Sequence, residues 1–274
     1  MADRDVYFAK ITRNQAGMFD RPFAQDLVAA IDPHNKQPED KEVRRYRKLW
    51  RLSRPKSEDG FITCKLGYVR TSPTAQTRYD EQLEDFVTDE ELANEGSFAM
   101  FVVDEVREIM AFEERLPDIK FQAFVGAFRL LLHKNDLRWS VVLLPDPTEF
   151  DEFVRSVDSI QRIRAVVHKP NPGFLQDAKN FEDVITQSHA ERAEVVAVAP
   201  RGGTLDPGAQ WVKGALAQIS EQGRGALSAT GSDHGHRRTW KFGTRLQVAV
   251  ISDDADTPES IWDWMVKQVR EKFE

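Results

Sequence analysis

The stretch from Asp158 to Phe174, DSIQRIRAVVHKPNPGF, constrains the fold more than any other part of the 274-residue chain. Its residues alternate between apolar and polar, which is typical of a β-strand because successive side chains point to opposite faces of a sheet. Ile163, Ala165 and Val167 share one apolar face. Pro170 lacks a backbone donor and biases the residue before it toward extended geometry, so the strand must end there.

The opposite face of this strand carries Arg162, Arg164 and His168 beside Val166. Two interpretations of this cationic face are open. It is either the solvated side of an antiparallel sheet or a surface that binds an anion.

The composition predicts a protein with a substantial core, because 41% of the residues are hydrophobic and seventeen are Phe. The net charge of -7 excludes a uniformly basic surface, although a local basic patch can still attract an anionic partner. The single cysteine, Cys64, excludes a disulfide framework and suits a reducing cytosol. Neither a signal-like N-terminus nor an apolar run of about 18 residues is present, so we expect a cytoplasmic protein that does not span a membrane.

Hydrophobic periodicity predicts both helices and strands along the chain. Strands are expected at residues 5–13, 97–103, 108–114, 138–145, 193–199 and 246–252, the last of them buried, and hairpins at 43–70 and around Gly231 to Gly235. Helices are expected at residues 21–31, 117–135, 148–157, 175–189, 206–222 and 257–273.

Four predicted helices have start signals: Asp20 as a cap, Pro117 in the first turn, Thr148 in a capping box with Asp151, and Asp206 as N-cap before Pro207. The alternation of hairpins and helices predicts an α+β fold with two lobes, 1–145 and 146–274, built from mixed or antiparallel sheets with interspersed helices.

Two blocks of charge stand out in the first lobe. Residues 41–56 contain eight Lys or Arg opposed only by Glu42, with Tyr46 and Trp50 interleaved, and these two aromatic residues either stack on bases or anchor the segment. Residues 80–95 contain eight acids and no base, which predicts a solvated helix and loop, a segment that neutralises the basic block, or a surface for a basic partner.

Motifs of catalysis are weak. The chain has neither a phosphate-binding loop nor a nucleophile elbow. Asp146, Asp177 and Lys179 match the residue types of a metal-dependent nuclease, but the last two fall in a predicted helix instead of a strand. His234 and His236 beside Asp233 lack a third ligand with recognisable spacing, so we expect neither a metal nor another cofactor.

Three segments resemble the C-terminal half of a family of prophage- and defence-associated bacterial proteins: FDEFVRSVDSIQRIRAVVHKPNPGF, EQGRGALSATGSD and RRTWKFGT. The overall layout is similar to RexA-type phage-exclusion proteins, with a Tyr-containing first strand, a basic hairpin and a Phe-x-x-Phe-Val hairpin at 98–103. The resemblance implies a dimeric, two-domain protein that binds double-stranded DNA without sequence preference and acts with a membrane-protein effector.

The leading hypothesis is therefore a non-enzymatic DNA-binding homodimer of a phage-exclusion or abortive-infection system. The residues expected to contact phosphates are Arg44, Arg45, Arg47, Lys48, Arg51, Arg162, Arg164, Lys169, Arg237, Arg238 and Lys241. The alternatives are the metal-dependent nuclease and a protein-interaction or sensor module that uses the acidic segment.

Overall fold

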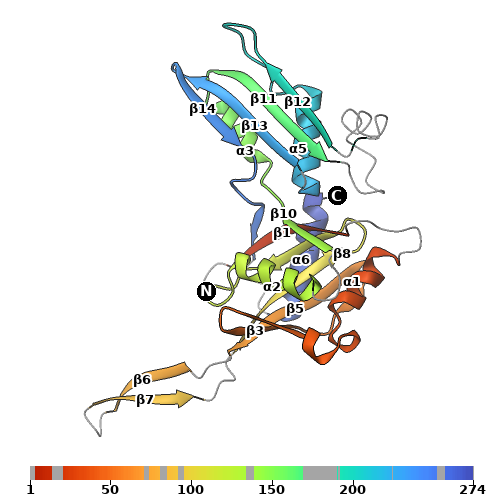
Figure 1. Cartoon of the computed structure of the whole chain (residues 1–274), viewed down its shortest axis with the longest axis vertical. Helices are drawn as coiled ribbons and strands as arrows, with labels where there is room; N and C mark the ends of the chain where they lie inside the picture. Colours follow the sequence, from red (N-terminus) through yellow and green to blue (C-terminus); the bar gives the residue numbers. More distant parts are fainter. Residues whose placement is uncertain are drawn as a thin grey trace.

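Two antiparallel sheets with helices packed on them form two lobes at opposite ends of the molecule (Figure 1). The computed structural model describes residues 4–13, 21–70, 74–80, 85–91, 96–133, 139–168, 190, 192–223, 225–251 and 257–273. The predicted α+β class with two lobes is confirmed.

The larger sheet has nine strands, seven of them in the order β10-β1-β9-β8-β5-β3-β2, while β15 pairs with β1 and β4 pairs with β5. Its strands are β1 (Asp5–Arg13), β2 (Glu42–Arg45), β3 (Lys48–Leu52), β4 (Lys56–Glu58), β5 (Phe61–Arg70), β8 (Gly96–Asp104), β9 (Ile109–Glu113), β10 (Trp139–Leu143) and β15 (Val248–Val250).

Helices cover both faces of this sheet. Tyr7, Ala9 and Ile11 of β1 pack in the same core as α1 (Phe23–Ile31) and α2 (Phe121–His133). Val6 and Phe8 pack in a second core with α6 (Pro258–Phe273). The alternate side chains of β1 therefore belong to two different cores. Each fully buried large apolar side chain stabilises the fold by roughly 1.5–3 kcal/mol.

The smaller sheet has the strand order β12-β11-β13-β14. Its strands are β11 (Ser159–His168), β12 (Arg192–Val198), β13 (Gly225–Asp233) and β14 (His236–Lys241). One face packs against α3 (Thr148–Arg155) and α5 (Gln210–Gln222) through a core that contains Ile163, Ala165 and Val167. The predicted apolar face of β11 is confirmed.

The predicted second lobe, 146–274, is wrong in its last part. β15 pairs with β1, and α6 contacts β8 and β9, so these two elements belong to the lobe of the larger sheet. The apolar side of α6 needs an apolar partner, and it finds the sheet face that α1 and α2 leave uncovered. The prediction that the strand at 246–252 is buried is also wrong, because Val248 and Val250 of β15 are 38% and 53% exposed.

Two predicted helix starts and one predicted capping box are wrong. α2 begins at Phe121 instead of near Pro117. Pro147 is the N-cap of α3, and Asp146 accepts hydrogen bonds from the backbone and hydroxyl of Thr148, so there is no capping box. Asp206 accepts from the backbone of Gly208 ahead of α5, whose N-cap is Ala209. Short polar side chains form such local turns as readily as caps.

Residues 43–70 form two hairpins instead of one. β2 and β3 turn at Tyr46 and Arg47, β4 and β5 turn at Asp59 and Gly60, and β3 pairs with β5. The predicted acidic helix is wrong too, because β6 (Thr74–Asp80) and β7 (Asp85–Glu91) form an antiparallel hairpin that projects from the larger sheet (Figure 1). Asp20 and the predicted helix at 175–189 lie outside the described residues.

Candidate nucleic-acid interface

The turn between β2 and β3 holds two large side chains in a strained conformation. Tyr46 and Arg47 have φ angles of 54° and 59°, as in the two-residue hairpin turns that favour Asn and Gly. Other residues in this left-handed region cost roughly 1–2 kcal/mol each. Tyr46 is also 70% exposed. Backbone strain of this kind clusters at functional sites, so the exposed tip is a candidate contact surface.

The cations of this segment differ in the contacts that they make. The Arg45 guanidinium lies 4.9 Å from the centroid of the Tyr46 ring and donates to its hydroxyl at 3.2 Å. Lys48 instead donates to the backbone oxygen of Asp118 at 2.8 Å, and Arg51 pairs with Glu42. We call the tip, with Arg44, Arg45, Tyr46 and Arg47, the basic hairpin.

Trp50 has no accessible surface and donates through Nε1 to the backbone oxygen of Arg45 at 3.3 Å. Trp50 therefore anchors the hairpin and cannot stack on a base. Of the two aromatic residues that the sequence singles out in this block, Tyr46 alone is available to a ligand.

A second group of cations lies on the face of the smaller sheet opposite its helices. The strand register places Arg162 and Arg164 of β11 on the same face as Arg237 and Lys241 of β14. We call this surface, with those four residues, the open sheet face. Arg162, Arg237 and Lys241 are exposed, whereas Arg164 pairs with Glu194 at 2.7 Å.

The register separates Arg238 from this surface. Arg238 is paired with Gly231 in the ladder, on the helix-covered side of the sheet, and its guanidinium lies 2.7 Å from Asp233. Lys169 lies outside the described residues. Of the six predicted contact residues in this lobe, four therefore share one face.

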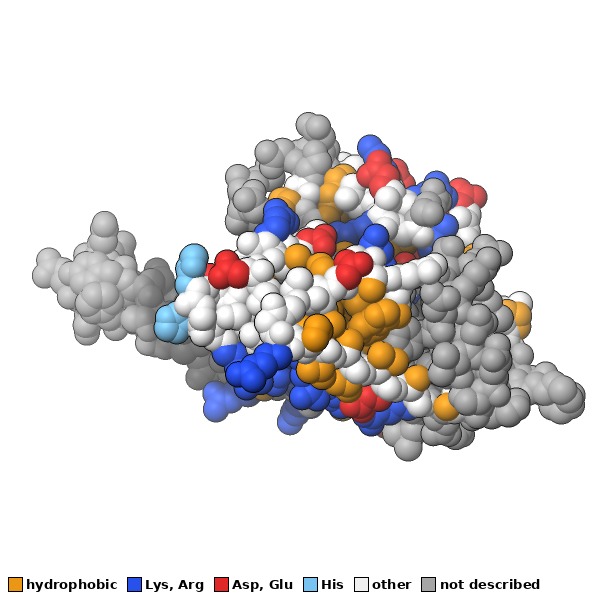
Figure 2. All heavy atoms as spheres, turned by 90° about the horizontal axis from the view of Figure 1, so that it is seen from above, with side chains coloured by type: hydrophobic (Ala, Val, Ile, Leu, Met, Phe, Trp, Pro, Cys, Tyr) orange, Lys and Arg blue, Asp and Glu red, His pale blue; other side chains and the backbone are white. Residues whose placement is uncertain are grey.

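The basic hairpin and the open sheet face belong to different lobes, which Figure 1 shows at opposite ends of the long axis. Seen from above, the smaller lobe presents Lys and Arg side chains beside a hydrophobic patch (Figure 2). Val196 and Val198 of β12 are 41% and 68% exposed. The sequence does not indicate this patch, since alternating valines are also typical of a buried strand.

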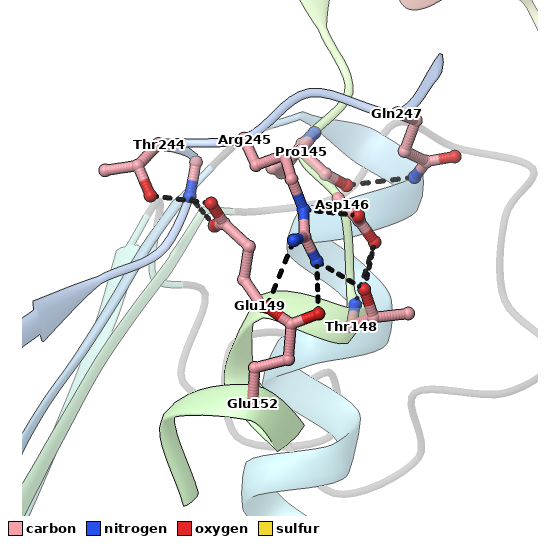
Figure 3. Close-up of polar contacts among 9 residues, drawn as sticks. Pro145, Asp146, Thr148, Glu149, Glu152, Thr244, Arg245 and Gln247 are labelled. Carbon is pink, nitrogen blue, oxygen red and sulfur yellow. Dashed lines mark hydrogen bonds and ion pairs between the residues drawn. The ribbon is translucent and has the colours of Figure 1, made fainter. Parts of the chain in front are cut away.

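Asp146, from the predicted nuclease set, is part of an ion-pair cluster at the junction of the lobes (Figure 3). Arg245 Nε donates to Asp146 at 2.8 Å, and its Nη2 lies 3.0 Å from Glu152. Burial of Asp146 opposes ionisation, but the hydrogen bonds from Thr148 and the charge of Arg245 outweigh it and lower the Asp146 pKa. Asp177 and Lys179 lie outside the described residues, so the nuclease set is not assembled by any contact that the structure describes.

The same junction holds two further buried polar groups. Glu149 accepts from the backbone of Gly243 at 3.1 Å and from the Thr244 hydroxyl at 2.6 Å. Gln247 Nε2 donates to the backbone oxygen of Pro145 at 3.0 Å (Figure 3). These contacts join the two chain segments that connect the lobes, and we assign them a structural role.

The turn between β13 and β14 brings together Asp158, Asp233 and His234, whose potential ligand atoms lie within 4.8 Å of one another. Sequence spacing could not reveal Asp158, which directly precedes β11. Asp158 accepts from the backbone of His234 at 2.7 Å, and Asp233 is held by Arg238. These contacts account for the arrangement as an anchored turn, and His236 is not part of the cluster.

Comparison with known proteins identifies a family but no activity. A family model described as a domain of unknown function, DUF4747, matches residues 32–242. Because the match covers well over half of the chain, the protein belongs to the DUF4747 family. The match runs from the end of α1 to just after β14 and includes both cationic surfaces. No match was found among the curated proteins. Within the described ranges, no helix has the length and apolarity required to cross a membrane.

Proposed function

We propose that this protein is non-enzymatic and binds double-stranded DNA through its phosphates, without sequence preference. The observation that carries the proposal is the basic hairpin, where Tyr46 and Arg47 are held at a conformational cost next to Arg44 and Arg45. Guanidinium groups suit phosphate because they present several donors in one plane. Contacts of this kind position a protein on a duplex but do not read its sequence.

The open sheet face is proposed as a weaker, second contact. Recognition of single strands on open sheets relies on exposed aromatic side chains that stack on bases. On the smaller sheet, Trp240 points to the covered side, where it stacks on Phe153 at 5.8 Å between ring centroids. Arg162, Arg237 and Lys241 on the open side favour contacts to a sugar-phosphate backbone.

The resemblance to RexA-type proteins extends the proposal to a cellular role. We propose a homodimer that acts in phage exclusion or abortive infection together with a membrane-protein effector. This part rests on the resemblance of the sequence alone, and it requires a separate test in cells that carry and lack the gene.

Binding to two unrelated duplexes, measured by fluorescence anisotropy at about 50 and 200 mM salt, tests the proposal. We expect equal affinities for the two duplexes and a loss on the order of 100-fold at the higher salt, as about four phosphate contacts would give. Affinity that does not depend on salt contradicts the proposal. Incubating supercoiled plasmid with the protein and Mg²⁺ adds a control, since nicking would favour the nuclease alternative.

A further inference from the structure

A cleft lies where the two edges of the larger sheet meet over helix α2. β2 and β10 stand at opposite ends of the strand order, yet Arg45 of β2 and Leu143 of β10 both line this cleft, together with residues of α2. The sheet therefore curls around α2 and brings its edges to one cavity of about 430 Å³. This volume is in the range of small-molecule binding sites.

The polar lining of the cleft is cationic. Arg129 donates through Nε to the backbone oxygen of Val141 at 3.0 Å, and through Nη2 to the same oxygen, which leaves further guanidinium N–H groups for a ligand. His133 Nε2 lies 2.6 Å from the backbone oxygen of Trp139, so this nitrogen carries the proton. Neither Asp nor Glu is among the described residues that line the cleft.

Arg129 lies in a partly desolvated position, and none of the described residues is shown to pair a carboxylate with it. Burial lowers the pKa of Arg129. An anion bound beside it would oppose this effect, because a nearby negative charge favours the charged guanidinium.

Gly126 places the second guanidinium over the same helix. A Cβ atom added to Gly126 would overlap with the Arg45 guanidinium, so the glycine allows Arg45 to lie across α2. Glycine in the middle of a helix is less stable than alanine, and helix stability therefore does not explain its presence. Its absent side chain instead explains how Arg45 reaches the cleft that Arg129 lines.

We propose that this cleft binds a terminal phosphate monoester of the size of a mononucleotide, with its phosphate between Arg45 and Arg129. Two arginine forks match the oxygen atoms of a phosphate, and Gln122 offers an additional donor. Leu130, which is 43% exposed, and Leu143 provide an apolar wall for the rest of the ligand. The site goes beyond duplex binding and does not depend on it, because the duplex backbone presents phosphodiesters.

Calorimetric titration with adenosine 5′-monophosphate, with adenosine as the uncharged comparison, tests the site. We expect the monophosphate to bind at least about tenfold more tightly than adenosine. Equal binding of the two compounds, or binding of neither, overturns the proposal.

Gly126→Ala provides the matched variant, because only the flexible end of Arg45 must move to admit the new methyl group. We expect unchanged or higher thermal stability together with about tenfold weaker binding of the monophosphate. Gly214→Ala in α5, where an added Cβ meets no atom within 4 Å, should leave binding unchanged. An unaltered affinity in Gly126→Ala also overturns the proposal.

The source of the phosphate, a free nucleotide or the end of a nucleic-acid strand, is decided by competition. Short single strands with a 5′-phosphate should displace the bound monophosphate more effectively than 5′-hydroxyl strands if strand ends enter the cleft. Equal competition by the two strands assigns the site to free nucleotides. Neither result depends on duplex binding, so failure of the two proposals can be told apart.

Discussion

The basic hairpin and the open sheet face both carry arginine, but the two surfaces hold it in different ways. On the hairpin, Tyr46 and Arg47 occupy left-handed backbone conformations and Arg45 stacks on Tyr46. On the sheet, Arg164 extends from a regular strand and pairs with Glu194. A regular sheet face with mixed charges is common on any solvated antiparallel sheet. The strained hairpin needs another reason, and we infer that it is the primary contact to DNA.

The largest expected effect comes from neutralising the basic hairpin. We predict that Arg44→Gln, Arg45→Gln and Arg47→Gln combined weaken duplex binding on the order of 100-fold and reduce the salt slope by about three. A control with the same charge change is Arg155→Gln, Lys213→Gln and Lys267→Gln, all exposed and outside both surfaces. Equal losses in the two triple variants would show that only the total charge matters.

Neutralising the open sheet face should have a smaller effect. We predict that Arg162→Gln, Arg237→Gln and Lys241→Gln together weaken duplex binding about tenfold, because these cations are proposed as a second contact that supports the hairpin. The same anisotropy titration measures this loss of duplex affinity. A larger loss than in the hairpin variant would reverse the ranking of the two surfaces.

Relaxing the hairpin turn should separate stability from binding. We predict that Tyr46→Asn with Arg47→Gly raises the free energy of unfolding by about 1–2 kcal/mol, since Asn-Gly suits this turn. Binding should weaken about tenfold at the same time, because the two tip side chains are lost. Urea denaturation measures the first quantity and anisotropy the second. A variant that is both more stable and a full-strength binder would remove the functional reason for the strain.

Lys10 is a buried cation, in contrast to the exposed cations of the two surfaces, and its effect is on stability. Lys10 is fully buried beside Glu108, and burial lowers its pKa from 10.5 to about 8. Between these two pH values the unfolded chain binds more protons than the folded chain, so stability rises with pH in this window. Between about pH 8 and 10.5, the free energy of unfolding of the wild type should rise by on the order of 2 kcal/mol relative to that of Lys10→Met. Urea titrations across that range measure the gain, and a flat difference between the two proteins contradicts it.

The sequence predicts the faces of the strands well because alternation depends only on neighbouring residues. β11 shows this, with Ile163 in the core and Arg162 exposed. The sequence does not predict packing between distant elements. The periodicity of α6 shows an apolar side but not which sheet that side will cover. Turn geometry was equally hidden, since Tyr46 and Arg47 are not typical of a two-residue hairpin turn.

The candidate surfaces were predicted in part for the same reasons. The density of cations in 41–56 indicated a basic segment, but the sequence could not show that Lys48 and Arg51 have structural partners. It also could not place Arg45 and Arg129 in the lining of one cleft, because the curl of the sheet around α2 brings them there. Side-chain type along the chain predicts charge, whereas the pairing of charges depends on the fold.

Photo-crosslinking at the hairpin tip tests the central claim most directly. Tyr46 is replaced by p-benzoylphenylalanine, and the protein is irradiated with a labelled duplex. The same replacement at Val106 is the control, because Val106 is 78% exposed on the turn between β8 and β9. We predict a crosslink at position 46 that disappears at high salt, with little or none at position 106. Equal crosslinking at the two positions, or none at position 46 under conditions where the duplex is bound, would contradict the assignment of the basic hairpin as the DNA contact.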